Sequence, residues 1–248
     1  MDGRHEEAEG LRDYFEVQLL FAQTLAEATG RPLADTCLAV TNLHRRLGLG
    51  RADGGASPGW SRYAEGLARC GSPAERLDWT VAFFVQTSPE PSTSLKFGCF
   101  SYELQDDDTV VRIHFSARDG EDDQGPLTRD KMDRRKADLK AMFAHVRAQH
   151  PQARSVRGGS WLYNLEAYRR LFPEDYGASR FAPARVRLDG TSSWGQLLDF
   201  RGAVKPDVRV ALVANLAHLD VAAPWTAFPL RALAAEAPIG SFYAFYGA

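Results

Sequence analysis

The spacing of the apolar residues changes near Leu95, and this change limits the folds that are open to the chain. Upstream, for example between Leu11 and Leu25, apolar residues recur at steps of three and four, which is the period of an amphipathic helix. Downstream, apolar and polar residues alternate as they do in a strand. A linker-like segment, residues 87–94, separates the two patterns. We therefore expect an α+β protein with a helical N-terminal part at residues 1–87 and a mixed part at residues 95–248.

Within the mixed part, two strands are predicted at residues 95–104 and 109–116, joined as an antiparallel hairpin by an acidic turn. A long helix from Thr128 to Gln149 then leads to a strand at residues 154–162. Because this helix connects the strands at 109–116 and 154–162, the two strands should run parallel in a mixed sheet. We expect the N-terminal helices to pack on that sheet. The aromatic segment SFYAFYG near the C-terminal end is expected to be a closing strand or a docked tail.

The composition is ordinary for a soluble globular protein, with 44% apolar and 25% charged residues among 248. The net charge of −2 argues against a broad basic surface for nucleic acid. Cys37, Cys70 and Cys99 fit neither a disulfide framework nor the spacing of a zinc site, which predicts a reducing, cytoplasmic compartment and no bound metal. The charged N-terminal segment is unlike a signal peptide, and no apolar run approaches the ~20 residues that cross a bilayer. We expect a soluble protein without a nucleic-acid or membrane partner.

The stretch RSVRGGSWLYNLEAYRRLFP, residues 154–173, combines a strand, two glycines and a polar and aromatic cluster before a helix. Gly158 and Gly159 are suited to a place where the backbone approaches another group closely. Open α/β sheets bind ligands outside such strand ends. The cluster that follows the glycines contains Ser160, Trp161, Tyr163 and Asn164. The alternative interpretation is a buried turn in which the aromatic residues fill the core.

The strand at residues 109–116 presents two different faces. Val111, Ile113 and Phe115 point to one side, and the intervening polar residues, Arg112, His114 and Ser116, point to the other. We expect a pocket between the ends of this strand and the strand at 154–162. Its predicted lining is His114, Ser116, Gly159, Ser160, Trp161 and Tyr163, and Arg112 and Asn164 are further candidates for substrate binding.

The order strand, helix, strand, helix, strand over residues 109–190 resembles the second half of a GNAT acyltransferase fold. More specifically, the pieces IHF, GPL, SWLYN and LFP resemble the GNAT-like C-terminal domain of a bacterial N-acyltransferase family, which also has a helical N-terminal domain. The resemblance implies a transferase that uses acyl-CoA and a small amine-bearing substrate. In typical GNAT enzymes a glycine-rich loop after the fourth strand binds the pyrophosphate of the coenzyme. This sequence departs from that pattern, because the corresponding place holds four carboxylates that would repel a pyrophosphate: Asp119, Glu121, Asp122 and Asp123.

An acyl transfer to an amine requires a base, donors for the developing oxyanion and an acid for the leaving thiolate. His114 is the best candidate base, because a histidine titrates near neutral pH. Tyr163 is the candidate acid, and the amides of Gly159 and Ser160 are candidate oxyanion donors. The sequence also allows a hydrolase that uses Ser160 with His114, although the G-x-S-x-G elbow is absent. A further alternative is a non-catalytic small-ligand-binding or regulatory protein on a GNAT-like scaffold. The sequence does not specify an oligomeric state.

Overall fold

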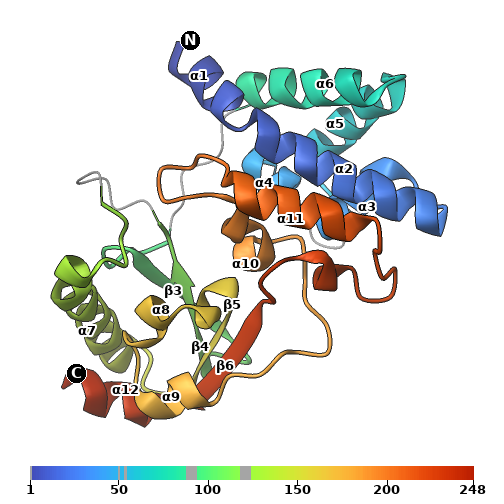
Figure 1. Ribbon diagram of the computed structural model, residues 1–248. Coiled ribbons are helices and arrows are strands. Elements are labelled where there is room, and N and C mark those ends of the chain that lie inside the picture. The colour runs from blue at the N-terminus through green and yellow to red at the C-terminus, as the bar shows by residue number, and fades with distance from the viewer. Residues whose placement is uncertain (1, 50, 53–54, 88–93, 118–123) are drawn as a thin grey trace. The chain divides into compact units, whose positions relative to one another are not determined.

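The computed structural model (Figure 1) describes all residues except 1, 50, 53–54, 88–93 and 118–123. It is an α+β protein with a mixed sheet, as expected. The chain separates into two compact units: unit 1 comprises residues 1–91 and 185–231, and unit 2 comprises residues 92–184 and 232–248. Residues 185–231, which were expected in the C-terminal part, therefore group with the N-terminal helices. The packing of those helices on the sheet stays a prediction.

Unit 1 is largely helical. Its first segment contains α1 (Asp2–Gly10), α2 (Arg12–Thr29), α3 (Leu33–Val40), α4 (Leu43–Arg46), α5 (Pro58–Arg69) and α6 (Pro73–Gln86). The only strands described before residue 95 are two-residue strands, β1 (Arg51–Ala52) and β2 (Gly55–Ala56). Its second segment adds α10 (Thr191–Trp194), the 3-10 turn η3 (Gly195–Leu197), α11 (Pro206–Leu216) and the 3-10 turn η4 (Pro224–Ala227).

The helix boundaries of unit 1 follow from local residues. Gly30 ends α2 in the left-handed region, at φ +72°, where a residue without a Cβ is favoured. Ser72 begins α6, because its hydroxyl accepts a hydrogen bond from the Glu75 amide and Pro73 suits the first turn. Trp194 ties the second segment to the first, since its buried indole N–H donates to the carbonyl oxygens of Val40 and Leu188 at 3.0 and 2.9 Å.

Unit 2 contains a four-stranded sheet in the order β3-β4-β5-β6. The strands are β3 (Phe100–Gln105), β4 (Val110–Phe115), β5 (Ser155–Ser160) and β6 (Leu233–Pro238). β3 and β4 form the predicted antiparallel hairpin, and β4 and β5 are parallel as predicted. β5 and β6 are antiparallel. The hairpin turn places Asp106, Asp107 and Asp108 at positive φ, a region in which aspartate is tolerated better than most residues.

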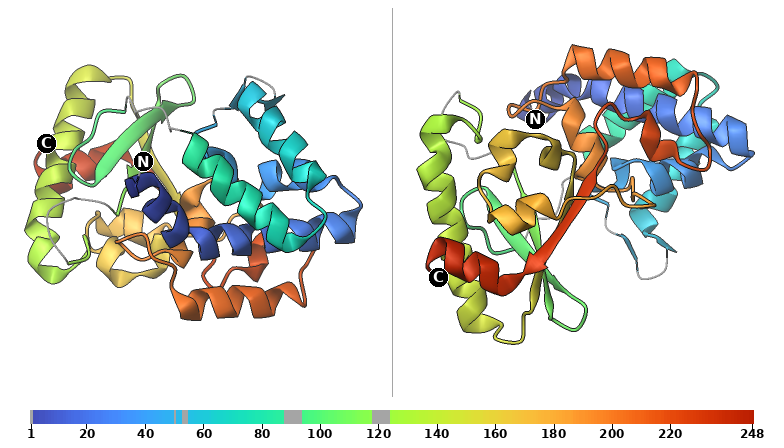
Figure 2. Two further views of the ribbon diagram at one scale, coloured as in Figure 1. Left: turned by 90° about the horizontal axis from the view of Figure 1, so that it is seen from above. Right: turned by 60° about the horizontal axis from the view of Figure 1, so that its bottom comes forward.

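Helices cover one face of this sheet. The elements are the 3-10 turn η1 (Arg129–Lys131), α7 (Met132–Gln149), the 3-10 turn η2 (Trp161–Asn164), α8 (Glu166–Arg169), α9 (Glu174–Ala178) and α12 (Ile239–Tyr246). Figure 2 shows α7 and α12 side by side, and the rings of Phe143 and Phe242 meet there at a centroid distance of 4.7 Å. Both rings belong to a core that includes Val111 of β4 and Val156 of β5. No helix among the described residues is long and apolar enough to cross a membrane.

Candidate functional site

The two middle strands of the unit 2 sheet share only a short ladder. Its residue pairs are Val110–Ser155, Val111–Val156 and Arg112–Arg157. The outer ladders are longer, because β4 pairs with β3 as far as Phe115 and β5 pairs with β6 as far as Ser160. Each middle strand therefore continues for three residues beyond the end of the common ladder. This divergence lies where the pocket was expected from the sequence.

A cluster of tyrosines lies at the divergence, on the face of the sheet that the helices cover. The hydroxyls of Tyr163 and Tyr176 form a hydrogen bond of 2.5 Å. A Cβ atom on Gly158 would lie 1.8 Å from the first hydroxyl oxygen and 2.4 Å from the second. Only a glycine lets both hydroxyls come this close to β5.

Tyr168 links the same cluster to the end of β4. Its ring meets that of Phe115 at a centroid distance of 5.5 Å and that of Tyr163 at 5.3 Å. Burial raises the pKa of Tyr163 and of Tyr168 well above the ordinary value. Both phenols are therefore protonated at neutral pH and can donate hydrogen bonds.

The opposite face of the sheet carries cross-strand ion pairs. On β3, Glu103 contacts the Arg112 guanidinium at 3.2 Å and the His114 Nε2 atom at 3.3 Å. On β5, Arg157 contacts Glu236 at 2.9 Å and Asp106 at 3.1 Å. The hydrogen bond from Arg157 lowers the pKa of the Glu236 carboxyl below its ordinary value.

The predicted base and the predicted acid lie on opposite faces of the diverging strands. His114 alternates with Ile113 and Val111, whose side chains belong to the core, so its imidazole lies on the polar face, with the side chain 42% exposed. Tyr163 is buried on the other face, against Gly158. The imidazole and the phenol are thus on opposite sides of the strand ends.

The remaining candidates lie at the end of β5 or in the turns that follow the two strands. The Ser160 hydroxyl accepts a hydrogen bond from the Leu162 amide at 3.1 Å and begins η2. The Asn164 side chain donates to the Trp161 carbonyl oxygen at 2.7 Å. Gly159 has open space where a Cβ would be, and Ser116 is exposed just after β4. The structure therefore brings these residues to the predicted end of the sheet, and their binding roles stay predictions.

Three side chains at this place were not identified from the sequence. Glu103 could have been found, because the hairpin register places it opposite Arg112. Tyr168 and Tyr176 carry no such signal, since they meet Tyr163 only through the fold of η2, α8 and α9.

Basic side chains surround the start of α7. Arg170 donates to the Leu127 carbonyl oxygen at 3.2 Å, and Lys131 donates to the Gln124 carbonyl oxygen at 3.0 Å. The Thr128 hydroxyl and the Arg170 Nε atom are buried and have no hydrogen-bond partner among the described residues. These two groups could bind an anion. The acidic positions 119 and 121–123 lie outside the described residues.

The part of the chain that the structure describes contains no group of three or more His, Cys, Asp or Glu side chains placed to hold a metal ion. In comparisons with known proteins, no family model, no curated protein and no solved structure matches this chain. The interpretation of the site therefore depends on its own residues.

Proposed function

We propose that this chain is an acyltransferase that moves an acyl group from acyl-CoA to a small primary amine. The supporting observation is the β4–β5 ladder, which ends after three residue pairs although both strands continue. Strand edges that diverge can bind an extended chain through backbone hydrogen bonds, as in β-strand addition. The pantetheine arm of coenzyme A is such a chain, because it carries two amide groups. The GNAT-like character of the fold is part of this proposal.

The two faces of the divergence supply a base and a hydrogen-bond donor for the reaction. With the thioester between the strand ends, His114 takes a proton from the amine as its nitrogen attacks the carbonyl carbon. Glu103, which contacts the imidazole, can pair with the imidazolium that results. The carbon–sulfur bond then breaks, and the thiolate leaves with a hydrogen bond from Tyr163, while the proton held on His114 passes to the thiolate through solvent.

The start of α7 supplies a place for the phosphates of the coenzyme. Arg170 carries a positive charge there, and its buried Nε atom can donate one further hydrogen bond. The Thr128 hydroxyl offers a second contact. Anions are favoured at the N-terminal end of a helix, because the peptide dipoles present their positive ends.

A cytoplasmic location belongs to the same proposal. Cys37, Cys70 and Cys99 form no disulfide bond with one another. Burial raises the pKa of the Cys37 thiol to about 12, so this thiol stays protonated and unreactive at neutral pH. Free thiols persist in a reducing compartment.

The test is an assay of free thiol released from acyl-CoAs of increasing chain length, with a panel of primary amines and mass detection of the amide product. We expect His114→Ala to lower kcat/KM by about 100-fold, the contribution of a general base. The melting temperature should stay close to that of the unmodified protein, because His114 is half exposed. His218→Ala, which removes an exposed histidine of unit 1, is the matched control and should retain full activity.

A non-catalytic binding or regulatory role is the alternative, and one observation favours it. Glu103 engages both Arg112 and His114, so two of the candidate site residues are already held by a neighbouring carboxylate. On this alternative, acyl-CoA would raise the melting temperature without any amine-dependent release of thiol. If acyl-CoA neither stabilises the protein nor reacts, the acyltransferase function is ruled out.

A further inference from the structure

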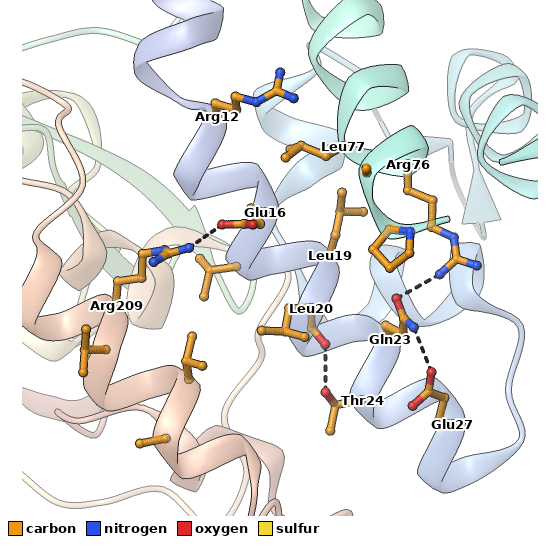
Figure 3. Close-up of a pocket in the computed structure, with 16 residues that line it drawn as sticks. Arg12, Glu16, Leu19, Leu20, Gln23, Thr24, Glu27, Arg76, Leu77 and Arg209 are labelled. Atoms are coloured by element: carbon orange, nitrogen blue, oxygen red, sulfur yellow. Dashed lines mark hydrogen bonds and ion pairs between the residues drawn. The ribbon is translucent and has the colours of Figure 1, made fainter. Parts of the chain in front are cut away.

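A groove runs along the outer face of α2 in unit 1. None of its residues belongs to the proposed acyl-transfer site, which lies in unit 2. α2 lies between α6 and α11 (Figure 3), and residues from all three helices line one cavity with a volume of about 670 Å³. This volume falls within the range of about 300–1,000 Å³ that small-molecule sites occupy. On α2 the lining extends from Arg12 to Glu27, a rise of about 22 Å at 1.5 Å per residue.

The floor of the groove is aliphatic. Leu19 and Leu20 come from α2, Leu77 from α6, and Val210 and Val213 from α11. Several of these side chains are unusually accessible: Leu20 is 41% exposed, and Val210 is 64% exposed. No aromatic residue lines the cavity among the described residues. Such walls suit a flexible hydrocarbon chain better than a ring, which binds best where aromatic faces can stack on it.

The length of the groove also suits an extended chain. Its lining follows about 22 Å of α2, and aliphatic side chains from three helices lie along it.

The charges around the groove indicate which polar group a bound hydrocarbon chain would carry. Three arginines line it, and two of them are neutralised by carboxylates: Arg12 by Asp78, and Arg209 by Glu16. Arg76 instead donates to the neutral side-chain oxygen of Gln23 at 2.9 Å and has no carboxylate partner among the described residues.

Figure 3 shows Arg76 and Gln23 at one end of the leucine floor and the Arg209–Glu16 pair at the other. Gln23 uses its amide nitrogen to bind Glu27 at 2.8 Å, so its oxygen is the group that a ligand anion would replace on Arg76. The N-terminal end of α6, at Pro73 and Ala74, lies on the same cavity and adds positive potential.

We propose that this groove binds a fatty acid, with its aliphatic chain on the α2 floor and its carboxylate on Arg76. The groove would be a second ligand site of the protein. This proposal does not depend on the acyl-transfer function. The apolar contacts supply most of the affinity, and the ion pair with Arg76 fixes the direction of the chain.

The test uses isothermal titration of the full chain with dodecanoate and with dodecanol, which has the same chain and no charge. We expect one saturable site for dodecanoate, with about tenfold weaker binding of dodecanol. Arg76→Gln should remove this preference, whereas Arg209→Gln, at the other end of the groove, should keep it. Leu20→Asp should weaken both ligands by about tenfold or more, because it places a carboxylate on the aliphatic floor. Val221→Asp is the matched control, since Val221 is 44% exposed in the same unit and does not line the cavity.

Three results would overturn the proposal. The first is the absence of saturable dodecanoate binding to the unmodified chain. The second is a Leu20→Asp variant that binds dodecanoate as tightly as the unmodified chain while its circular dichroism spectrum is unchanged. The third is a dimer in sedimentation that Leu20→Asp converts to a monomer, because the groove would then be an interface between two copies of the chain.

Discussion

Gly158 and Gly159 are adjacent in the sequence, but their surroundings differ. The position of a Cβ on Gly158 is already occupied by the hydroxyls of Tyr163 and Tyr176, whereas a Cβ on Gly159 would meet nothing within 4 Å. Neither glycine has a positive φ, so the difference between them is one of space and not of backbone conformation. The two residues therefore give a matched pair of substitutions.

Gly158→Ala should destabilise the protein by about 1–3 kcal/mol, the usual cost of overpacking a core. Gly159→Ala should change the free energy of unfolding by less than about 0.5 kcal/mol. Urea denaturation of both variants checks this. Tyr163→Phe removes the nearest hydroxyl, so the double variant with Gly158→Ala should recover part of the loss. Equal stabilities for the two alanine variants would show that the tyrosine hydroxyls do not lie against Gly158.

At the scale of the elements, the pairing of β5 and β6 includes an ion pair between Arg157 and Glu236. The pKa of Glu236 is lowered in the folded state, first by the hydrogen bond from Arg157. The pair therefore stabilises the fold at pH values above the ordinary glutamate pKa of 4.5, and this stabilisation is lost as the pH falls through the lowered pKa.

Glu236→Gln should lower stability at neutral pH by about 0.2–1 kcal/mol, because both side chains are about two-fifths exposed and solvent screens them. The difference between this variant and the unmodified protein should shrink as the pH is lowered below 4.5. Melting temperatures measured from neutral to acidic pH test this, with Glu174→Gln on α9 as a control outside the pair. A difference in melting temperature that stays constant with pH would show that the ion pair is not the cause of the lost stability.

The elements that the sequence predicted well are those with a strong local period. The hairpin of β3 and β4 and the long helix α7 follow from alternation and from the three-and-four spacing, and the parallel pairing of β4 with β5 follows from the helix between them. The C-terminal aromatic segment was harder. It forms α12, in which Ile239, Phe242 and Tyr246 are buried at steps of three and four, although aromatic residues also alternate there. In so short a segment the two periods overlap, and only the position of the core decides between them.

The location of the candidate site could be predicted from the sequence, but the contacts between its side chains could not. His114 and Gly158 follow from strand patterns, and their separation onto two faces follows from the β4–β5 register. The tyrosine cluster does not, because Tyr163, Tyr168 and Tyr176 meet through turns whose geometry the spacing of apolar residues does not encode.

At the scale of the whole molecule, unit 1 is built from two segments that are far apart in the sequence. Spacing shows which residues face a core, but not which core they join, and residues 185–231 were therefore expected with the sheet. Their apolar side chains pack instead among the N-terminal helices. Trp194 is fully buried there, and its ring meets those of Phe21 and Phe228 at centroid distances of 5.4 and 4.8 Å.

This arrangement predicts that the N-terminal helices are not stable alone. A fragment of residues 1–91 lacks Trp194 and Leu212, whose side chains fill the centre of unit 1, and it leaves Phe21 exposed. Losing one large core side chain costs about 3–5 kcal/mol, a large share of the stability of a small domain. We expect the fragment to show reduced helicity and no cooperative thermal transition by circular dichroism. Joining residues 185–231 to it through a flexible linker should restore the transition, and substituting Trp194→Ala in the joined protein should weaken it again. A cooperative transition in the 1–91 fragment alone would show instead that these helices form an independent domain, as the linker-like segment at residues 87–94 first suggested.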